Sequence, residues 1–174
     1  MVMFTIFNAD KSATTTRATK VASRKEFQNS SELLKALQSI CEATVNETDA
    51  SKIKWVETAH NFLKIRRKIF LQSPLLAEKL EIRPAENFLK NEEDCYLSFF
   101  DEDHYVSWTI SKWKEHEAKF LEKNLWSELE KDPSKFSALG DVKHSTFTSI
   151  AYISMIANIR GDMQTCLKLI KSLD

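Results

Sequence analysis

The side chains best suited to chemistry lie in an acidic cluster, Asp101, Glu102, Asp103 and His104, which directly follows an apolar run. If that run is a strand, Asp101 and Asp103 point to the same face, because alternate side chains of a strand share a face. Two carboxylates placed in this way could share a divalent ion, as in nucleotidyl-transfer enzymes. A metal-dependent nuclease or nucleotidyl-transfer enzyme using Asp101 and Asp103 is therefore one hypothesis.

Other features of the sequence argue against catalysis. No second carboxylate or histidine motif accompanies the acidic cluster, which is equally explained as a solvated loop. The chain has no GxSxG motif, and its two glycines are too few for a phosphate loop or a dinucleotide site. The sequence favours a non-catalytic protein and assigns it no catalytic residue, no metal site and no cofactor.

Basic side chains gather in two stretches that contain no acidic residue, at residues 11–25 and 58–77. The first belongs to a polar arm or loop predicted at residues 8–25, where hydroxyl side chains accompany the charges, and the second includes the outer side of a helix predicted at residues 55–72. Such a mixture can contact phosphates. A solvated loop and an organelle transit peptide are alternatives for the first stretch. The candidate nucleic-acid-binding residues are Lys11, Arg17, Lys20, Arg24, Lys25, Lys64, Arg67 and Lys68.

Two tryptophans are the candidate residues for binding a protein partner. Trp108 and Trp126 fall within one helical pattern that runs from about Val106 to Lys131, and their separation of 18 residues is five helical turns. They should therefore project on the same side, where exposed tryptophans would serve as interface anchors. The alternative is that another layer of the same domain covers them.

The amino-acid composition limits the fold classes that are possible for this chain. The chain has 174 residues, of which 43% are hydrophobic, and only 2 glycines and 3 prolines. These values predict a single, mainly α domain over residues 1–174, with about five to seven helices and a short N-terminal strand or hairpin. The chain has 25 basic and 25 acidic residues, so its net charge gives no indication of a nucleic-acid or membrane partner. Three scattered cysteines without a CxxC pair indicate a reducing compartment such as the cytoplasm.

The hydropathy pattern predicts the main elements. Helices are expected from Ser30 or Ser31 and over residues 55–72, the latter capped by Asp49 or Ser51 and ended by Pro74. Residues 96–100 could be a strand or the start of a helix. The remaining expectations are a strand at Val2–Phe7, a second strand near Thr19–Ala22, and two C-terminal helices that form a hairpin around a turn at Gly161 and Asp162.

Arg66 sits near the centre of the apolar stripe of the 55–72 helix. An unpaired buried charge costs several kcal/mol, so a buried Arg66 requires a carboxylate. We therefore predict that Arg66 is largely buried and paired with an acidic residue from the block at residues 92–103, which contains no basic side chain.

Together these observations favour a helical interaction protein that docks a protein partner through aromatic and charged surfaces. Nucleic-acid binding through the basic residues is the second hypothesis, and the two-carboxylate enzyme is the third. The sequence predicts no membrane segment and leaves the oligomeric state open.

Overall fold

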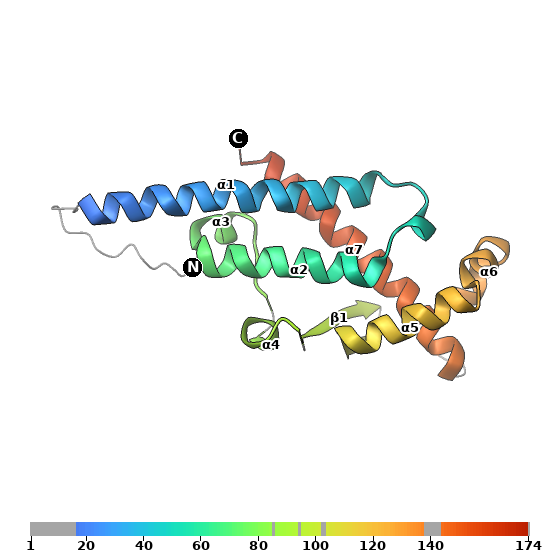
Figure 1. The fold of residues 1–174 in the computed structure, drawn as a ribbon. Coiled ribbons are helices and arrows are strands. Elements are labelled where there is room, and N and C mark those ends of the chain that lie inside the picture. Colours follow the sequence, from blue (N-terminus) through green and yellow to red (C-terminus); the bar gives the residue numbers. More distant parts are fainter. Residues whose placement is uncertain (1–16, 85, 94, 102–103, 138–143, 174) are drawn as a thin grey trace.

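A computed structural model of the protein describes residues 17–84, 86–93, 95–101, 104–137 and 144–173. Within these residues, seven α-helices and two 3₁₀ helices accompany one two-stranded antiparallel sheet (Figure 1). This architecture confirms the mainly α class predicted from the sequence. The elements are α1 (Arg17–Asn46), η2 (Ala50–Lys52), α2 (Trp55–Gln72), α3 (Pro74–Lys79), α4 (Glu86–Lys90), β1 (Tyr96–Asp101), β2 (His104–Thr109), α5 (Ile110–Glu122), α6 (Leu125–Lys131), η3 (Pro133–Phe136) and α7 (His144–Lys171).

Three long helices form the main body. α1 and α2 lie side by side, and α7 crosses behind them toward α5 and the sheet (Figure 1). Leu37 of α1, Trp55 and Phe62 of α2, and Met155 of α7 are among the fully buried side chains of the shared core. Each such side chain contributes about 1.5–3 kcal/mol by leaving water. The body is therefore held mainly by the apolar faces that its helices bury against one another.

The bounds of α2 agree with the prediction, but its N-terminal cap does not. The helix ends at Gln72, because Pro74 disfavours helical geometry at the preceding residue. Asp49 instead begins η2, where its carboxylate accepts a hydrogen bond from the backbone of Ser51. The N-cap of α2 is Lys54, whose side chain makes no capping bond. A carboxylate from a different helix, that of Glu117 in α5, accepts a hydrogen bond from the backbone N–H of Val56 instead.

The N-terminal prediction is wrong where the structure describes it. α1 begins at Arg17, so residues 19–22 are helical rather than a strand, and the helix does not start at Ser30. Residues 17–25 of the predicted basic loop are likewise helical backbone. The rest of that arm and the strand expected at Val2–Phe7 lie outside the described residues.

The sheet is a hairpin in the middle of the chain. β1 and β2 pair in antiparallel register, with Phe99 opposite Val106 and Phe100 opposite Tyr105. Leu97, Phe99 and Val106 are buried on one face, as expected when one side of a hairpin packs against a core. The strand alternative for residues 96–100 is thus the correct one.

The helix predicted from Val106 to Lys131 is three elements. Val106 belongs to β2, and α5 begins at Ile110. Thr109 is the N-cap of α5, because its hydroxyl accepts a hydrogen bond of 3.1 Å from the backbone N–H of Lys112. α5 and α6 are separated at Asn124, whose φ of 53° lies in the left-handed region that asparagine tolerates. The Thr109 cap and the left-handed Asn124 therefore divide a stretch that the hydropathy pattern predicts as one helix.

The two C-terminal helices predicted from the sequence are one. α7 continues through Gly161 and Asp162 without a turn, so the expected helical hairpin is wrong. Its buried residues Ile159, Met163, Cys166 and Ile170 follow one another at intervals of four, three and four residues, which is the spacing of one helix face. Continuous burial of this face against the body outweighs the helix-breaking tendency of the glycine.

Candidate functional site

Among the side chains that the structure describes, the most exposed aromatic ones lie on the outward face of the hairpin. Tyr96 is 46% exposed, Phe100 70% and Tyr105 58%. Register places all three on the same face together with Ser98 and Ser107, and we call these five residues the hairpin outer face. Large exposed aromatic groups are uncommon unless they contact another molecule. This face is therefore the candidate binding site.

The hairpin outer face is internally ordered. The ring centroids of Phe100 and Tyr105 are 4.7 Å apart, and the hydroxyls of Ser98 and Ser107 are 2.6 Å apart across the strands. Hydrogen bonds with these two serines lower the pKa of Tyr105 from its ordinary value. Cross-strand contacts of this kind stabilise a particular arrangement of the side chains by about 0.2–1 kcal/mol each.

The opposite face anchors the hairpin to the body. The indole Nε1 of Trp113 donates a hydrogen bond of 2.8 Å to the carbonyl of Leu97, and its ring packs against Phe99 at 5.8 Å between centroids. Both contacts connect α5 to β1. A rigid support of this kind lowers the entropic cost of binding through the outer face.

The two tryptophans predicted as anchors are not arranged as expected. Trp108 lies in β2 and Trp126 in α6, so the five-turn helical relationship between them does not exist. Trp108 is half-buried with its ring 4.5 Å from that of Trp113, and Trp126 is half-buried against Phe120 at 5.3 Å. The alternative in which the same domain covers them describes both side chains better, because each ring packs on the core.

The sequence carries a signal for the hairpin outer face that the helical interpretation missed. Buried and exposed side chains alternate here, which is the period of a strand with one solvent-exposed face: Cys95, Leu97 and Phe99 are buried, and Tyr96 and Phe100 are exposed. A run of six residues is too short for this period to exclude a helix without a partner strand.

The basic residues of α2 are in different environments. Lys68 is exposed and Lys64 is half-buried. Arg67 already has partners, because its guanidinium donates to the carbonyls of Phe88 at 3.0 Å and Leu89 at 3.2 Å. Arg67 therefore has a structural function, whereas the exposed Lys68 stays a candidate for phosphate binding.

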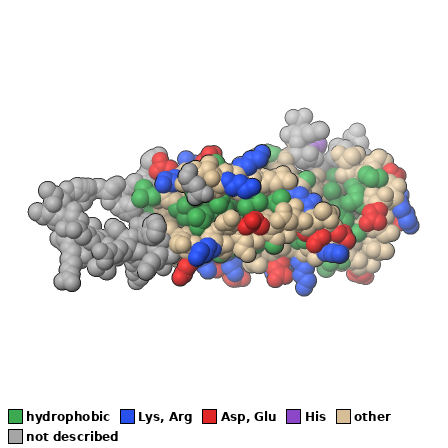
Figure 2. All heavy atoms as spheres, turned by 90° about the horizontal axis from the view of Figure 1, so that it is seen from above, with side chains coloured by type: hydrophobic (Ala, Val, Ile, Leu, Met, Phe, Trp, Pro, Cys, Tyr) green, Lys and Arg blue, Asp and Glu red, His purple; other side chains and the backbone are tan. Residues whose placement is uncertain are grey.

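Charge of both signs is mixed over the surface. On the face seen in Figure 2, lysine and arginine side chains alternate with aspartate and glutamate side chains, and hydrophobic groups show between them. The blocks of like charge along the chain thus do not produce a face of one sign in this view. The side chains of Arg17, Lys20, Arg24 and Lys25, as well as Lys11, lie outside the described side chains.

The acidic cluster is described only in part. β1 ends at Asp101, which pairs with His104 at the end of the hairpin, and residues 102–103 lie outside the described residues. Among the residues that the structure does describe, no three His, Cys, Asp or Glu side chains are grouped to hold a metal ion. The two-carboxylate hypothesis for Asp101 and Asp103 stays a prediction.

Arg66 is partly buried, and no ion pair joins it to the described residues of the acidic block. Its guanidinium lies 5.1 Å from the ring centroid of Phe62. The acidic block does supply a partner, but to the next residue: Glu92 lies 3.5 Å from the guanidinium of Arg67. Arg66 points in a different direction from Arg67, because successive residues of a helix are rotated by about 100° around its axis.

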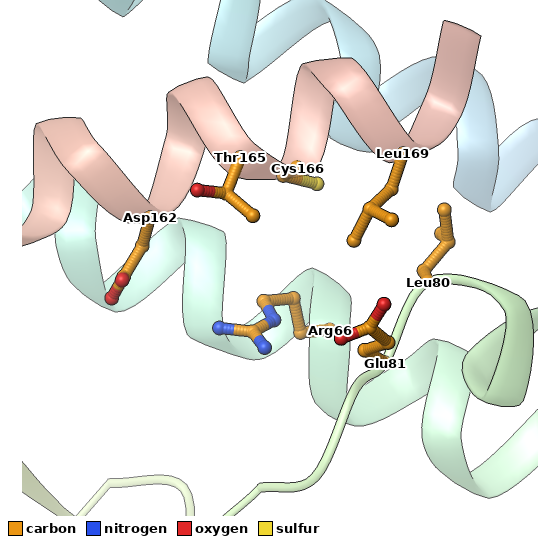
Figure 3. Close-up of a pocket in the computed structure, with 7 residues that line it drawn as sticks. All are labelled: Arg66, Leu80, Glu81, Asp162, Thr165, Cys166 and Leu169. Atoms are coloured by element: carbon orange, nitrogen blue, oxygen red, sulfur yellow. The ribbon is translucent and has the colours of Figure 1, made fainter. Parts of the chain in front are cut away.

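Arg66 lines a cavity of about 250 Å³ between α2 and α7. Its guanidinium points toward Asp162 of α7, with Glu81 on the opposite wall (Figure 3). Partial desolvation raises the pKa of Asp162, and the charge of Arg66 opposes that increase. Thr165 and Cys166 of α7 complete the polar part of the lining.

Comparisons with protein-family models, with curated proteins and with solved structures find no match to this chain. None of the helices in the described part of the chain combines the length and the apolar character needed to cross a membrane.

Proposed function

We propose that this protein is a non-catalytic helical interaction protein that docks a protein partner through the hairpin outer face. The observation that carries the proposal is the exposure of Tyr96, Phe100 and Tyr105 on one face of a hairpin whose other face is buried. Aromatic side chains are enriched among the residues that dominate binding energy at protein interfaces. The ordered rings need little further ordering on binding, which favours affinity.

The chemistry around this face indicates the kind of partner. In the sequence, the acidic block at residues 92–103 overlaps the first strand of the hairpin, and it contains six acidic residues and no basic one. A partner with complementary potential would present basic side chains around an apolar centre. Association should then be faster at low salt than at high salt, because steering between opposite charges is screened by ions.

The test compares partner capture by matched variants. Tagged full-length protein and its Phe100→Ser/Tyr105→Ser double variant are incubated with extract of the native source, and bound proteins are quantified. Loss of two central anchors should reduce recovery of a specific partner by at least about tenfold, which corresponds to roughly 1.4 kcal/mol. Circular dichroism verifies that the variant is folded.

Leu121→Ser is the control for this experiment. Leu121 is 51% exposed and lies on α5, so its replacement removes apolar surface of the same kind away from the hairpin outer face. Recovery of the partner should be unchanged by this variant. Equal recovery by the wild type and the double variant would contradict docking through the hairpin.

Nucleic-acid binding is a second proposal, supported by the position of α1. The first turns of α1 extend beyond α2 and α3 (Figure 1), and this part of the helix contains Arg17, Lys20, Arg24 and Lys25. A projecting basic helix can approach a phosphate backbone without obstruction by the body. Binding of this type is non-specific and weakens steeply with salt.

Titration of labelled duplex and single-stranded DNA at two salt concentrations tests the second proposal. Replacement of the four basic residues by glutamine should abolish most of the binding and reduce the slope of log K against log salt by about 0.9 for each lost phosphate contact on duplex. Absence of binding by the wild type at low salt would exclude this proposal and leave the first untouched.

A further inference from the structure

A groove of about 350 Å³ lies between α6 and α7, beside η2. α6 and η2 are at the same end of the molecule (Figure 1), and no residue that lines the groove belongs to the hairpin. Clefts that bind small molecules have volumes of roughly 300–1,000 Å³ and a mostly apolar lining with a few polar groups. The apolar walls of this groove are formed by Trp126, Leu129, Ile153 and Ile156.

Arg160 of α7 is the one charged side chain among the described residues that line the groove. Its guanidinium lies 5.0 Å from the ring centroid of Trp55, and its Nη2 donates a hydrogen bond of 3.2 Å to the carbonyl of Glu47. These two contacts hold the guanidinium in place. A ligand that binds to it therefore loses little affinity to the ordering of this side chain.

The charge of Arg160 is not compensated in the part of the chain that the structure describes. The ion pairs found there involve other residues, and Nε of Arg160 is shielded from solvent without a hydrogen-bond partner. A guanidinium has five N–H donors and binds a carboxylate through paired hydrogen bonds. The lining of the groove thus favours a ligand with a negative charge, and a carboxylate above all.

Gly161 leaves space in the same groove. It lines the groove from the interior of α7, and a Cβ built there meets no atom within 4 Å. Its φ is not positive, so the backbone does not require glycine at this position, and glycine inside a helix is less favourable than alanine. The missing side chain therefore gives no advantage to the helix but keeps the groove open beside Arg160.

We propose that the groove between α6 and α7 binds an organic acid with one carboxylate and an apolar chain. The chain lies against Trp126, Ile153 and Ile156, and the carboxylate accepts hydrogen bonds from the guanidinium of Arg160. This site goes beyond docking through the hairpin outer face and does not depend on it.

Isothermal titration calorimetry of the full chain with octanoate tests the proposal. 1-Octanol has the same chain without the charge, and acetate has the charge without the chain. Octanoate should bind saturably with one molecule per protein, and at least about tenfold more tightly than either control, because both parts of the groove contribute. Absence of saturable octanoate binding, or equal affinities for octanoate and 1-octanol, would overturn the proposal.

Two variants test the two features of the groove separately. Arg160→Gln should weaken octanoate binding by about tenfold or more and leave the affinity for 1-octanol unchanged. Gly161→Leu places a side chain in the groove, so it should weaken the binding of both molecules, while thermal unfolding shows no loss of stability because leucine is a better helix former than glycine. An unchanged octanoate affinity in folded Gly161→Leu would contradict binding at this site.

Arg66→Gln is the matched control. This arginine lines the other cavity, between α2 and α7, and its replacement removes the same charge without altering the groove. Octanoate affinity should be unchanged. A loss in Arg66→Gln but not in Arg160→Gln would assign octanoate to the other cavity and overturn the proposal.

Discussion

The hydroxyl of Tyr152 donates a hydrogen bond of 2.5 Å to Oε2 of Glu117, which joins α7 to α5. The same carboxylate oxygen accepts a hydrogen bond of 3.1 Å from the backbone N–H of Val56, in the first turn of α2. α2 has no side-chain cap of its own at Lys54, so Glu117 satisfies an N–H that would otherwise lack a partner and places negative charge at the positive end of the helix dipole. One carboxylate therefore connects three helices that local sequence does not associate.

The Tyr152–Glu117 bond predicts a pH dependence at alkaline pH. Burial and the neighbouring carboxylate raise the pKa of Tyr152 above its ordinary value of about 10. The native state therefore holds its proton where the unfolded state releases it, so the stability is fully present below pH ~10 and is lost as pH rises toward the raised folded pKa. The loss should approach about 1.4 kcal/mol per pH unit from this group.

Urea unfolding of the wild type and of Tyr152→Phe from neutral pH to alkaline pH measures this contribution. The variant should be less stable at neutral pH by about 1–2 kcal/mol, because Glu117 loses a donor. The difference between the two proteins should shrink above pH ~10, since phenylalanine has no proton to release. A difference that stays constant with pH would show that Tyr152 does not titrate in this way.

Adjacent arginines of α2 should differ in their contribution to stability. Arg67 is partly buried, bonds two carbonyls near α4 and pairs with Glu92, whereas Arg66 contacts the Phe62 ring and faces a cavity. Arg67→Ala should lose about 2 kcal/mol, because carbonyls and a carboxylate lose their partner. Arg66→Ala should lose less, about 0.5–1 kcal/mol, because its one contact is with an aromatic ring and such cation–π contacts at accessible sites are of this size.

Chemical denaturation of both arginine variants at neutral pH compares them in the same helix and at neighbouring positions. Arg67→Lys is a useful third variant, because lysine keeps the charge but lacks the fork that reaches two carbonyls. It should be intermediate in stability. A larger loss for Arg66→Ala than for Arg67→Ala would reverse the assignment.

Gly161→Ala should stabilise the protein. Gly161 lies inside α7 without a positive φ, and a Cβ built there meets no atom within 4 Å. Alanine reduces the conformational entropy of the unfolded chain and has the higher helix propensity, so a gain of about 0.5–1 kcal/mol is expected. If Gly161 were instead the left-handed residue of a turn, thermal unfolding would show a loss.

Aromatic truncation on the two sides of the hairpin should have unequal effects. Trp108 packs against Trp113, His116 and Phe147, and Trp108→Ala should lose about 3 kcal/mol or more because it leaves a cavity in this cluster. Phe100→Ala should lose about 1 kcal/mol, since this side chain is exposed and its main contact is the Tyr105 ring. Similar losses in guanidinium unfolding would argue that the hairpin outer face is part of the core.

The sequence by itself determined the fold class and the best-marked helix. Scarce glycine and proline and long apolar periods require long helices, and Pro74 ends α2 through a steric effect on its own neighbour. Such effects act over a few residues, so they can be seen without knowledge of the rest of the chain. The same pattern also held the evidence for a continuous α7 in the regular spacing of Ile159, Met163 and Cys166, although Gly161 suggested a break.

Only the tertiary structure decided which residues meet. Residues 96–101 fit the period of a strand as well as that of a helix, and the pairing of β1 with β2 makes them a strand. The exposed aromatic surface therefore lies at Phe100 and not at Trp108. The position of Glu92 beside α2 selected Arg67 rather than Arg66 as its partner. These relationships depend on how whole helices are placed relative to one another. That placement is determined by the burial of their combined apolar faces, and it cannot be read from the hydropathy of a short stretch of sequence.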